Sequence, residues 1–267
     1  MPYCQYGTIN NKLMQNDLAG WKVLTFTALG STNNYCRDLL QEKDVREGTV
    51  VRAIDQTEGK GQGTNTWESE PGKNLTFSII LRPRFLNPPD QFLLSMVASL
   101  AISGFLQEYT GGISIKWPND IYADDKKIAG ILIENSVIEN SIDSTIMGIG
   151  VNINQVKFSN RLGTAISLAQ LTGMTFSLVE SLEKLCSMVS SLYNQLRRGE
   201  QDIIKKRYTG LMYRLNTEST YRSSGQEFRA IARGVDNSGR LILDLPGKGT
   251  RCFSFQEVEF SVPGNKT

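Results

Sequence analysis

The sequence of 267 residues contains no histidine. That absence excludes a Ser-His or Cys-His nucleophile, a His-ligated zinc site and a histidine proton shuttle. Cysteine is scarce, and Cys4, Cys36, Cys186 and Cys252 lie far apart without a Cys-x-x-Cys pair, so neither a metal cluster nor a disulfide framework is expected. Any catalysis must therefore use lysine, carboxylate, amide and backbone groups, and a reducing, cytoplasmic location is the expectation.

The sequence also lacks an excess of charge and a long hydrophobic run. Its 29 Lys and Arg nearly balance its 27 Asp and Glu, so neither nucleic acid nor a membrane is an expected partner. The longest apolar stretch, residues 92–106, is interrupted by serine and glycine and is shorter than the ~20 residues that span a bilayer, which predicts a buried helix. Residues 1–5 lack the basic start of a signal peptide, so export is not expected.

Alternating apolar patterns predict an α+β domain over residues 1–213 and a small β-barrel over residues 214–267. The connection at 135–143 is short and polar, so the strands that flank it should pair antiparallel in a mixed, mostly antiparallel sheet. The predicted strands are 23–26, 49–54, 75–81, 113–116, 127–134, 144–152, 228–233, 241–245 and 251–260. The predicted helices follow Ser31 and Thr32 and span about 91–109, 165–172 and 176–208.

A glycine-rich loop occupies residues 59–67 and reads Gly-Lys-Gly-Gln-Gly-Thr-Asn-Thr-Trp. It is not a P-loop, because no Gly-Lys-Ser/Thr follows, and Thr66 stands where a dinucleotide motif needs glycine. The glycines allow a close backbone approach to a ligand, Lys60 supplies charge, and Trp67 can stack on a flat ring. The alternative is a polar loop that ends in a core tryptophan.

A second motif, Lys-Trp-Pro-Asn-Asp, occupies residues 116–120. Pro118 restricts the backbone, so Asn119 and Asp120 should sit in a defined turn. Such a turn can hold a magnesium phosphate, or it can simply satisfy its own backbone.

Two lysines open a strand that is apolar on both faces. Strict alternation puts Lys127 with Ala129 and Ile131, and Lys126 with Ile128 and Gly130. A lysine amine in apolar surroundings needs an anion to offset its desolvation, and a carboxylate or phosphate would serve. Alternation does not choose between the two lysines, and the alternative is that both reach solvent.

The segment 148–154 reads Gly-Ile-Gly-Val-Asn-Ile-Asn, and its alternation leaves the face of Gly148 and Gly150 without side chains. That bare face would admit a planar base, with Asn152 as a donor and acceptor at its end. Close packing of the backbone is the alternative. The residues before the first helix are 30–33, Gly-Ser-Thr-Asn, which supply a helix cap or hydrogen bonds to a polar ligand.

Together and in this order, these motifs resemble the biotin protein ligases. The Ser-Thr-Asn triplet, the glycine loop that closes on tryptophan, Lys-Trp-Pro-Asn-Asp, Lys-Ile-Ala-Gly and Gly-x-Gly-x-Asn fall within residues 30–154, and the Gly-Val-Asp-x-x-Gly turn at 234–239 extends the similarity. The resemblance implies a class II synthetase-like catalytic domain with an SH3-like C-terminal barrel. It also implies activation of biotin by MgATP to biotinyl-5′-AMP and transfer to a lysine of a biotin carboxyl carrier protein domain.

The resemblance also assigns roles to individual residues. Lys127 would be the catalytic cation that bridges the biotin carboxylate and the α-phosphate. The residues that would hold biotin are Ser31, Thr32, Asn33, Gln56, Gly59, Lys60, Gly61, Lys127 and Gly130. The residues that would bind ATP are Lys60, Gln62, Asn65, Trp67, Asn119, Asp120 and Asn152, with Asp120 facing Mg2+ through the phosphates and Asn152 reading the adenine.

The sequence departs from the family pattern in the glycine loop. Gly63-Thr64 stands where an arbitrary residue followed by glycine is expected, and Lys60, Gln62 and Asn65 replace positions that are often arginine. A less basic loop predicts faster leakage of the adenylate than from an arginine-rich relative. About thirty residues precede the Ser-Thr-Asn triplet, too few for a winged helix-turn-helix, so the type without a DNA-binding domain is expected.

Two other readings remain open at this point. A lipoate or octanoate ligase or transferase would share the architecture, and a non-catalytic sensor of biotin or its adenylate would share the binding residues. The carrier protein is not identified by the sequence, and a homodimer through a free edge strand is compatible with it.

Overall fold

The computed structural model describes residues 14–18, 20–41, 45–159 and 164–261. Cys4 and residues 1–5 lie outside this part of the chain. The structure therefore does not bear on the expectations about Cys4 and about a signal peptide. Within it, Cys36, Cys186 and Cys252 are free cysteines.

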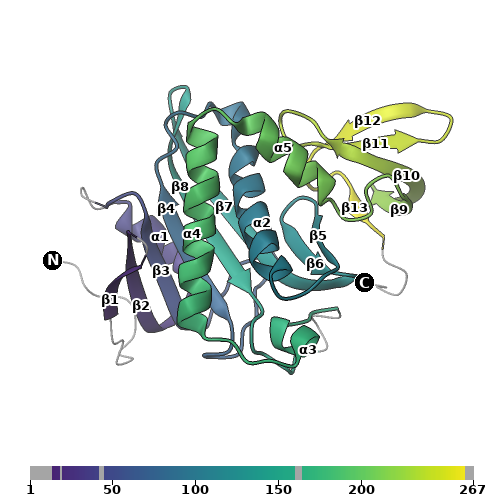
Figure 1. Cartoon of the computed structure of the whole chain (residues 1–267). Helices are drawn as coiled ribbons and strands as arrows, with labels where there is room; N and C mark the ends of the chain where they lie inside the picture. Colours follow the sequence, from purple (N-terminus) through teal and green to yellow (C-terminus); the bar gives the residue numbers. More distant parts are fainter. Residues whose placement is uncertain (1–13, 19, 42–44, 160–163, 262–267) are drawn as a thin grey trace.

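An eight-stranded sheet forms the larger domain (Figure 1), in the order β1-β2-β3-β4-β8-β7-β6-β5. The strands are β1 Met14–Leu18, β2 Trp21–Leu29, β3 Thr49–Gln56, β4 Leu75–Leu81, β5 Ile113–Lys116, β6 Asp120–Ala123, β7 Lys126–Ile138 and β8 Ser141–Val151. Only the pair β2 and β3 is parallel among the described pairs of this sheet. The prediction of a mixed, mostly antiparallel sheet is confirmed, including the antiparallel pairing of β7 with β8.

Helices cover one face of this sheet, where α2 and α4 lie side by side in front of it (Figure 1). The helices of this layer are α2 Phe92–Gln107, α4 Leu178–Arg197 and α5 Gln201–Gly210, while the one-turn η1 Pro88–Asp90 precedes α2 and the short α3 Leu168–Thr172 precedes α4. Helix α2 is apolar all round and buried among the sheet, α4 and α5, as a core helix should be. The stretch Pro88–Gln107 is long and apolar enough to cross a membrane, but 67% of it is buried inside the fold.

Helix α1, Thr32–Leu39, lies on the opposite face of the sheet against β3, β4 and β8. It buries a separate small cluster around Phe26, Cys36 and Ile80. The sheet face beside α1 carries no second helical layer among the described contacts, so that face is free to form a ligand cavity.

The predicted boundaries are wrong in three places. The predicted helix 176–208 is two helices, because Gly199 adopts a positive φ of 81° between α4 and α5. The predicted strand 251–260 is split into β12 Gly249–Phe253 and β13 Glu259–Phe260. Strands β1, β6 and β9 Glu218–Ser223 were not predicted, and β6 begins at Asp120, inside the segment that was expected to form only a turn.

The C-terminal domain is a five-stranded antiparallel sheet with the order β12-β11-β10-β9-β13. Its two remaining strands are β10 Gln226–Val235 and β11 Leu241–Leu245. The outer strands β12 and β13 are not paired with each other, so the structure shows an open sheet and does not confirm the closed barrel.

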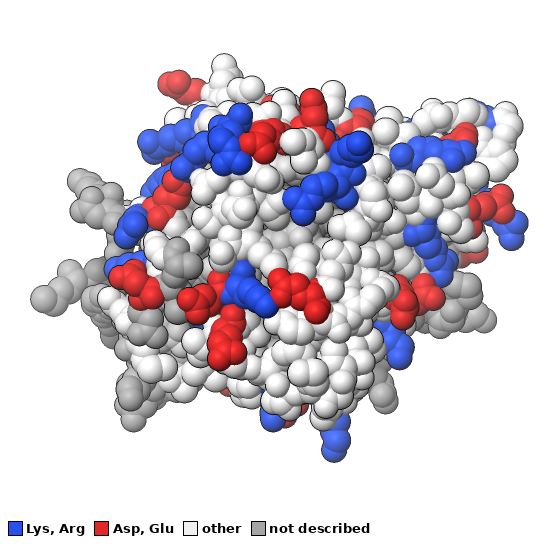
Figure 2. Space-filling view, in the orientation of Figure 1, with Lys and Arg blue, Asp and Glu red and all other residues white. Residues whose placement is uncertain are grey.

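The two domains are joined by buried polar contacts as well as by apolar packing. Trp117 Nε1 donates to the carbonyl oxygen of Gly239 at 2.8 Å, and the linker pairs with β5 through Ile115 and Met212. Lys and Arg are interspersed with Asp and Glu on the face seen in Figure 2, which shows no continuous surface of one sign.

Candidate active site

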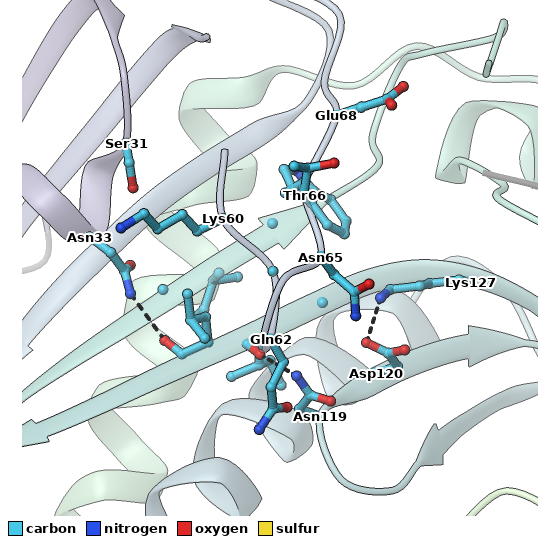
Figure 3. A pocket seen from close by; sticks show the side chains of 18 of the residues that line it. Ser31, Asn33, Lys60, Gln62, Asn65, Thr66, Glu68, Asn119, Asp120 and Lys127 are labelled. Atoms are coloured by element: carbon cyan, nitrogen blue, oxygen red, sulfur yellow. Dashed lines mark hydrogen bonds and ion pairs between the residues drawn. The ribbon is translucent and has the colours of Figure 1, made fainter. Parts of the chain in front are cut away.

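A cavity of about 580 Å3 opens on the sheet face that carries α1. This volume lies in the range of small-molecule sites. It is lined by every residue that the resemblance assigned to the site except Gly59 and Asn152, namely Ser31, Thr32, Asn33, Gln56, Lys60, Gly61, Gln62, Asn65, Trp67, Asn119, Asp120, Lys127 and Gly130. Ser31 and Asn33 lie on one side of it, and Lys127 and Asp120 on the other, with the glycine loop between them (Figure 3).

The start of α1 supplies one end of the cavity. Ser31 caps the helix by accepting from the backbone N–H of Asn34. The backbone N–H of Thr32 donates to Gln56 Oε1 at 3.0 Å, which leaves the Nε2 group of Gln56 without a hydrogen bond among the described residues. The Gln56 Nε2 group lies beside Gly59, where it would be 2.8 Å from an added Cβ.

The floor of the cavity is the glycine face of β8. Ile149 and Val151 point into the main core, and Gly148 and Gly150 lie on the opposite face, which confirms the predicted alternation. A Cβ on Gly148 would come within 2.2 Å of Asn33 Oδ1, and one on Gly150 within 2.4 Å of Trp67 Cε2. The Trp67 indole therefore covers the bare face of β8 at Gly150. The predicted planar base would have to bind at another part of the cavity.

The glycine loop is a tight hairpin. Trp67 N–H donates to the Gly59 carbonyl, and Gly61 N–H donates to the Asn65 carbonyl. Gly59 must be glycine, because a Cβ there would lie 2.2 Å from the Trp67 carbonyl oxygen. Gly63 has a φ of 66°, so the glycine that departs from the family pattern supplies the left-handed turn at the tip.

Lys127 reaches the cavity because its strand is irregular. The pairing of β6 with β7 shifts between Ile121 and Tyr122, so Ile128 is an extra residue opposite them. Ile128 and Ala129 are both buried in the core, and Lys127 turns toward the Gly130 side. The prediction from strict alternation, which placed Lys127 with Ala129, is therefore wrong.

The Lys127 amine is held at the cavity wall. Its Nζ lies 2.6 Å from Asp120 Oδ1 and 5.8 Å from the centre of the Trp67 ring. Both partners are partly exposed, at 35% and 23% of their side chains, and Figure 3 shows the pair facing the loop. The neighbouring Lys126 is exposed, so the structure distinguishes the two lysines that alternation could not.

The Lys-Trp-Pro-Asn-Asp turn is fixed from both sides. Asn119 Nδ2 donates to the Ile131 carbonyl at 2.7 Å, and the Asn119 carbonyl accepts from the Ile131 N–H.

Lys116 is half-buried and donates to Tyr122 Oη at 3.0 Å. Burial lowers the pKa of Lys116, and burial followed by the charge of Asp120 raises the pKa of Tyr122 to about 12.

The two predicted residues outside the cavity lining have structural contacts. Asn152 Nδ2 donates to the Ile166 carbonyl, and its buried Oδ1 has no hydrogen-bond partner among the residues that the structure describes. Gly59 closes the hairpin below the loop tip. Their roles toward adenine and biotin stay predictions.

The structure adds lining residues to which the resemblance assigned no role. They include Thr66, Glu68, Phe77, Pro118, Tyr122, Thr164 and Phe255. Phe255 comes from the C-terminal domain and packs against Trp117 at 6.4 Å between ring centres. No local pattern marks it, because its proximity depends on how the second sheet docks.

The charged groups of this lining are Lys60, Lys127, Asp120 and Glu68. Two cations and fixed amide donors suit a ligand with a carboxylate or phosphates. No group of three or more Cys, Asp or Glu side chains gathers among the described residues, so a metal would need oxygens from a ligand.

Comparison with known proteins identifies the relatives of this chain. Residues 25–152 match the sequence model of the biotin/lipoate A/B protein ligase family. The chain is 30% identical over 236 residues to the bifunctional ligase/repressor BirA of Bacillus subtilis, a match that covers 86% of this chain and 72% of that protein. It is 29% identical over 217 residues to the biotin–(acetyl-CoA-carboxylase) ligase of Paracoccus denitrificans, covering 79% of this chain and 89% of that one.

The fold is also shared with solved structures. The biotin protein ligase from Aquifex aeolicus in complex with biotin and ATP aligns with a TM-score of 0.75 and 26% identity, over 90% of this chain and 99% of that chain. The sequence relatives and this structural match agree with the order of motifs around the cavity. The chain belongs to the biotin protein ligase family, and it is a ligase.

Proposed function

We propose that this ligase activates biotin with ATP to biotinyl-5′-AMP and then transfers the biotinyl group to a lysine of a biotin carboxyl carrier protein domain. The observation that carries the proposal is one continuous cavity with amide and hydroxyl groups at one end and the Lys127–Asp120 pair at the other. The first end suits a neutral, hydrogen-bonding head, and the second suits a carboxylate next to phosphates.

In the first step, a carboxylate oxygen of biotin attacks the α-phosphorus of ATP, and the bond to pyrophosphate breaks. Negative charge accumulates around the transferred group, and a fixed cation that faces it lowers the barrier. We assign this role to Lys127, whose amine lies at the cavity wall, 2.6 Å from Asp120 Oδ1. In the second step, the amine of the carrier lysine attacks the acyl carbon and AMP leaves, which forms an amide bond.

Mg2+ is part of the proposal through the phosphates of ATP. The residues fit such an ion, because Asp120 offers a carboxylate and Asn119 offers a carboxamide oxygen, while the Asn119 nitrogen is occupied by Ile131. One or two carboxylates plus phosphate oxygens are the usual ligands of Mg2+ in such sites. If Asp120 held the ion, its pair with Lys127 would be weakened and the Lys127 amine would be available to the substrate.

Three further features of the proposal concern the rest of the molecule. The open C-terminal sheet is proposed to act as the SH3-like module expected from the sequence. The outermost strand β1 is a free edge among the described strands, and a homodimer through it is proposed. Mixed surface charge supports a protein carrier over nucleic acid as the macromolecular partner.

Transfer to a carrier tests the complete reaction. The purified protein is incubated with ATP, Mg2+ and biotin, and with the biotinyl domain of an acetyl-CoA carboxylase, and the domain is weighed by mass spectrometry. We expect one biotinyl addition that disappears when the target lysine is changed to Arg. Addition of a lipoyl or octanoyl group from the matching acid, without biotinylation, would contradict the proposal and favour the lipoate branch of the family.

A further inference from the structure

A second cavity, of about 290 Å3, lies between the two domains and outside the site described above. Strand β5 of the larger sheet and strand β13 of the C-terminal sheet lie side by side there (Figure 1). It has half the volume of the catalytic cavity and adjoins it at Pro118 and Phe255, which line both. Most of its wall is apolar or aromatic, with contributions from Trp117, Leu241 and Phe260.

Lys116 brings an amine to this lining without a counter-ion. Its Nζ donates to Tyr122 Oη at 3.0 Å and lies 5.8 Å from the centre of the Phe260 ring. No carboxylate among the described residues forms an ion pair with it. An ammonium group has three N–H donors, so Lys116 can still donate to a ligand, and a half-buried cation against an apolar wall favours an anion.

The other charges around this cavity are already compensated. Arg222 lies 2.9 Å from Glu227 and 3.6 Å from Glu259, and these contacts account for the second cation and for the carboxylate of the lining. Asp120, whose charge also acts on Lys116, is paired inside the catalytic cavity. The positive charge that remains without an ion pair at the lining is that of Lys116.

Tyr221 adds a second polar group without a partner. The residue is fully buried, and its hydroxyl makes no hydrogen bond within the part of the chain that the structure describes. Burial is the first cause of the shifted pKa of both groups, which falls for Lys116 and rises for Tyr221, and the charge of Arg214 acts on both. The amine and the hydroxyl therefore lie within reach of the same guanidinium, as two residues of one lining should.

We propose that this cavity is a second binding site, for a small monocarboxylic acid with an aromatic or apolar body. The carboxylate accepts from the Lys116 amine and from the Tyr221 hydroxyl, and the body packs against the aromatic wall. A monocarboxylate fits better than a phosphate, because one cation without an ion pair faces a mostly apolar wall. The site is independent of the proposed function, since neither Lys116 nor Tyr221 takes part in that reaction.

Two substitutions remove the proposed contacts and keep the shape of the wall. Lys116→Met removes the amine and keeps an apolar stem, and Lys248→Met is its control at an exposed lysine in the turn between β11 and β12. Tyr221→Phe removes only the hydroxyl, and its control is Tyr109→Phe, because Tyr109 lines a different surface groove. Lys127→Ala reports on binding in the catalytic cavity.

The probe is phenylacetate, with 2-phenylethanol as its uncharged counterpart, and binding is measured by ligand-observed NMR titration. We expect phenylacetate to bind the unmodified protein and both controls alike. Its Kd should rise about tenfold in Lys116→Met and about threefold in Tyr221→Phe, because each variant lacks one hydrogen bond to the carboxylate. The affinity for 2-phenylethanol should be the same in Lys116→Met as in the unmodified protein. Binding of phenylacetate should persist in Lys127→Ala and in protein saturated with biotin.

The outcomes are decisive for the site. A lack of phenylacetate binding by the unmodified protein would overturn the proposal, as would equal affinities of Lys116→Met and Lys248→Met. Competition by biotin, or loss of binding in Lys127→Ala, would place the acid in the catalytic cavity and would also overturn it.

The tyrosine variant keeps the test valid if Lys116→Met fails to fold. The hydroxyl of Tyr221 has no hydrogen-bond partner among the described residues, so Tyr221→Phe should melt no lower than the unmodified protein. Equal affinities of Tyr221→Phe and Tyr109→Phe would then overturn the proposal. Biotin activation is measured separately by pyrophosphate exchange, so failure of one proposal is distinguishable from failure of the other.

Discussion

A single methyl group on the cavity floor should disable the site by moving Trp67. In Gly150→Ala, the added Cβ would lie 2.4 Å from Trp67 Cε2, whereas ordinary contacts begin at 3.4 Å, so the indole must retreat by about 3.4 − 2.4 = 1.0 Å. The strand cannot yield instead, because β8 is paired on both sides with β4 and β7. The indole therefore moves outward, into the volume that the substrates need.

The size of the effect follows from the cost of overpacking. Inserting a methyl group into a packed contact costs about 1–3 kcal/mol, which corresponds to a loss of about fivefold to about 150-fold in kcat/KM if it falls on substrate binding. Gly130→Ala should have a smaller effect, because its Cβ would lie 3.0 Å from the same ring and requires a retreat of about 3.4 − 3.0 = 0.4 Å. Gly210→Ala meets no atom within 4 Å and serves as the control.

The assay is biotin-dependent pyrophosphate exchange on the three variants, with melting temperatures measured alongside. We expect the rates to fall in the order Gly210→Ala, Gly130→Ala, Gly150→Ala, with melting temperatures close to the unmodified protein. Equal kcat/KM in Gly150→Ala and Gly210→Ala would refute the reasoning, as would a crystal structure of Gly150→Ala with the indole unmoved.

Three further predictions address the cation, the loop and the domain contact. Lys127→Ala should lower adenylation about 100-fold or more and keep the melting temperature, because it deletes charge aimed at the transition state; turnover near that of the unmodified protein in the folded variant would contradict the assignment. Gln62→Arg should slow the release of preformed biotinyl-5′-AMP severalfold, since Gln62 lines the cavity and the loop would regain positive charge; an unchanged release rate in a filter-binding assay would dismiss this idea. Gly239→Ala should destabilise by about 2 kcal/mol more than Gly225→Ala, because both positions have positive φ but only the first would place a Cβ 2.1 Å from Phe92; equal chemical-denaturation midpoints would argue against it.

The sequence predicted the parts of the site that depend on local patterns. Alternation placed Gly148 and Gly150 on the cavity face, and the turn residues of 116–120 identified a fixed Asn-Asp pair. These features follow from the two-residue period of a strand and from the rigid backbone of proline. Both depend only on residues that are adjacent in the sequence. The resemblance to a family was needed to choose between Lys126 and Lys127, and the structure shows Lys127 at the cavity wall and Lys126 exposed.

The missed features depend on contacts between distant segments. The bulge at Ile128 reverses the face of Lys127, and it arises from the pairing of β6 with β7 and not from the local pattern. Trp67 covers the glycine face because the hairpin of its loop points it there. Ser78, whose hydroxyl contacts Thr32 and Asn33 below the cavity lining, had a detectable signal, since Thr76 and Ser78 are two polar residues at a spacing of two in an otherwise apolar strand.

The measurement that tests the central claim most directly is ATP–pyrophosphate exchange on the purified protein, with biotin, lipoate and octanoate supplied separately. The account predicts exchange with biotin alone, because in the proposed function the polar end of the cavity around Thr32 and Gln56 would bind the ureido ring and Lys127 would face the carboxylate. Exchange with lipoate or octanoate and none with biotin would contradict it.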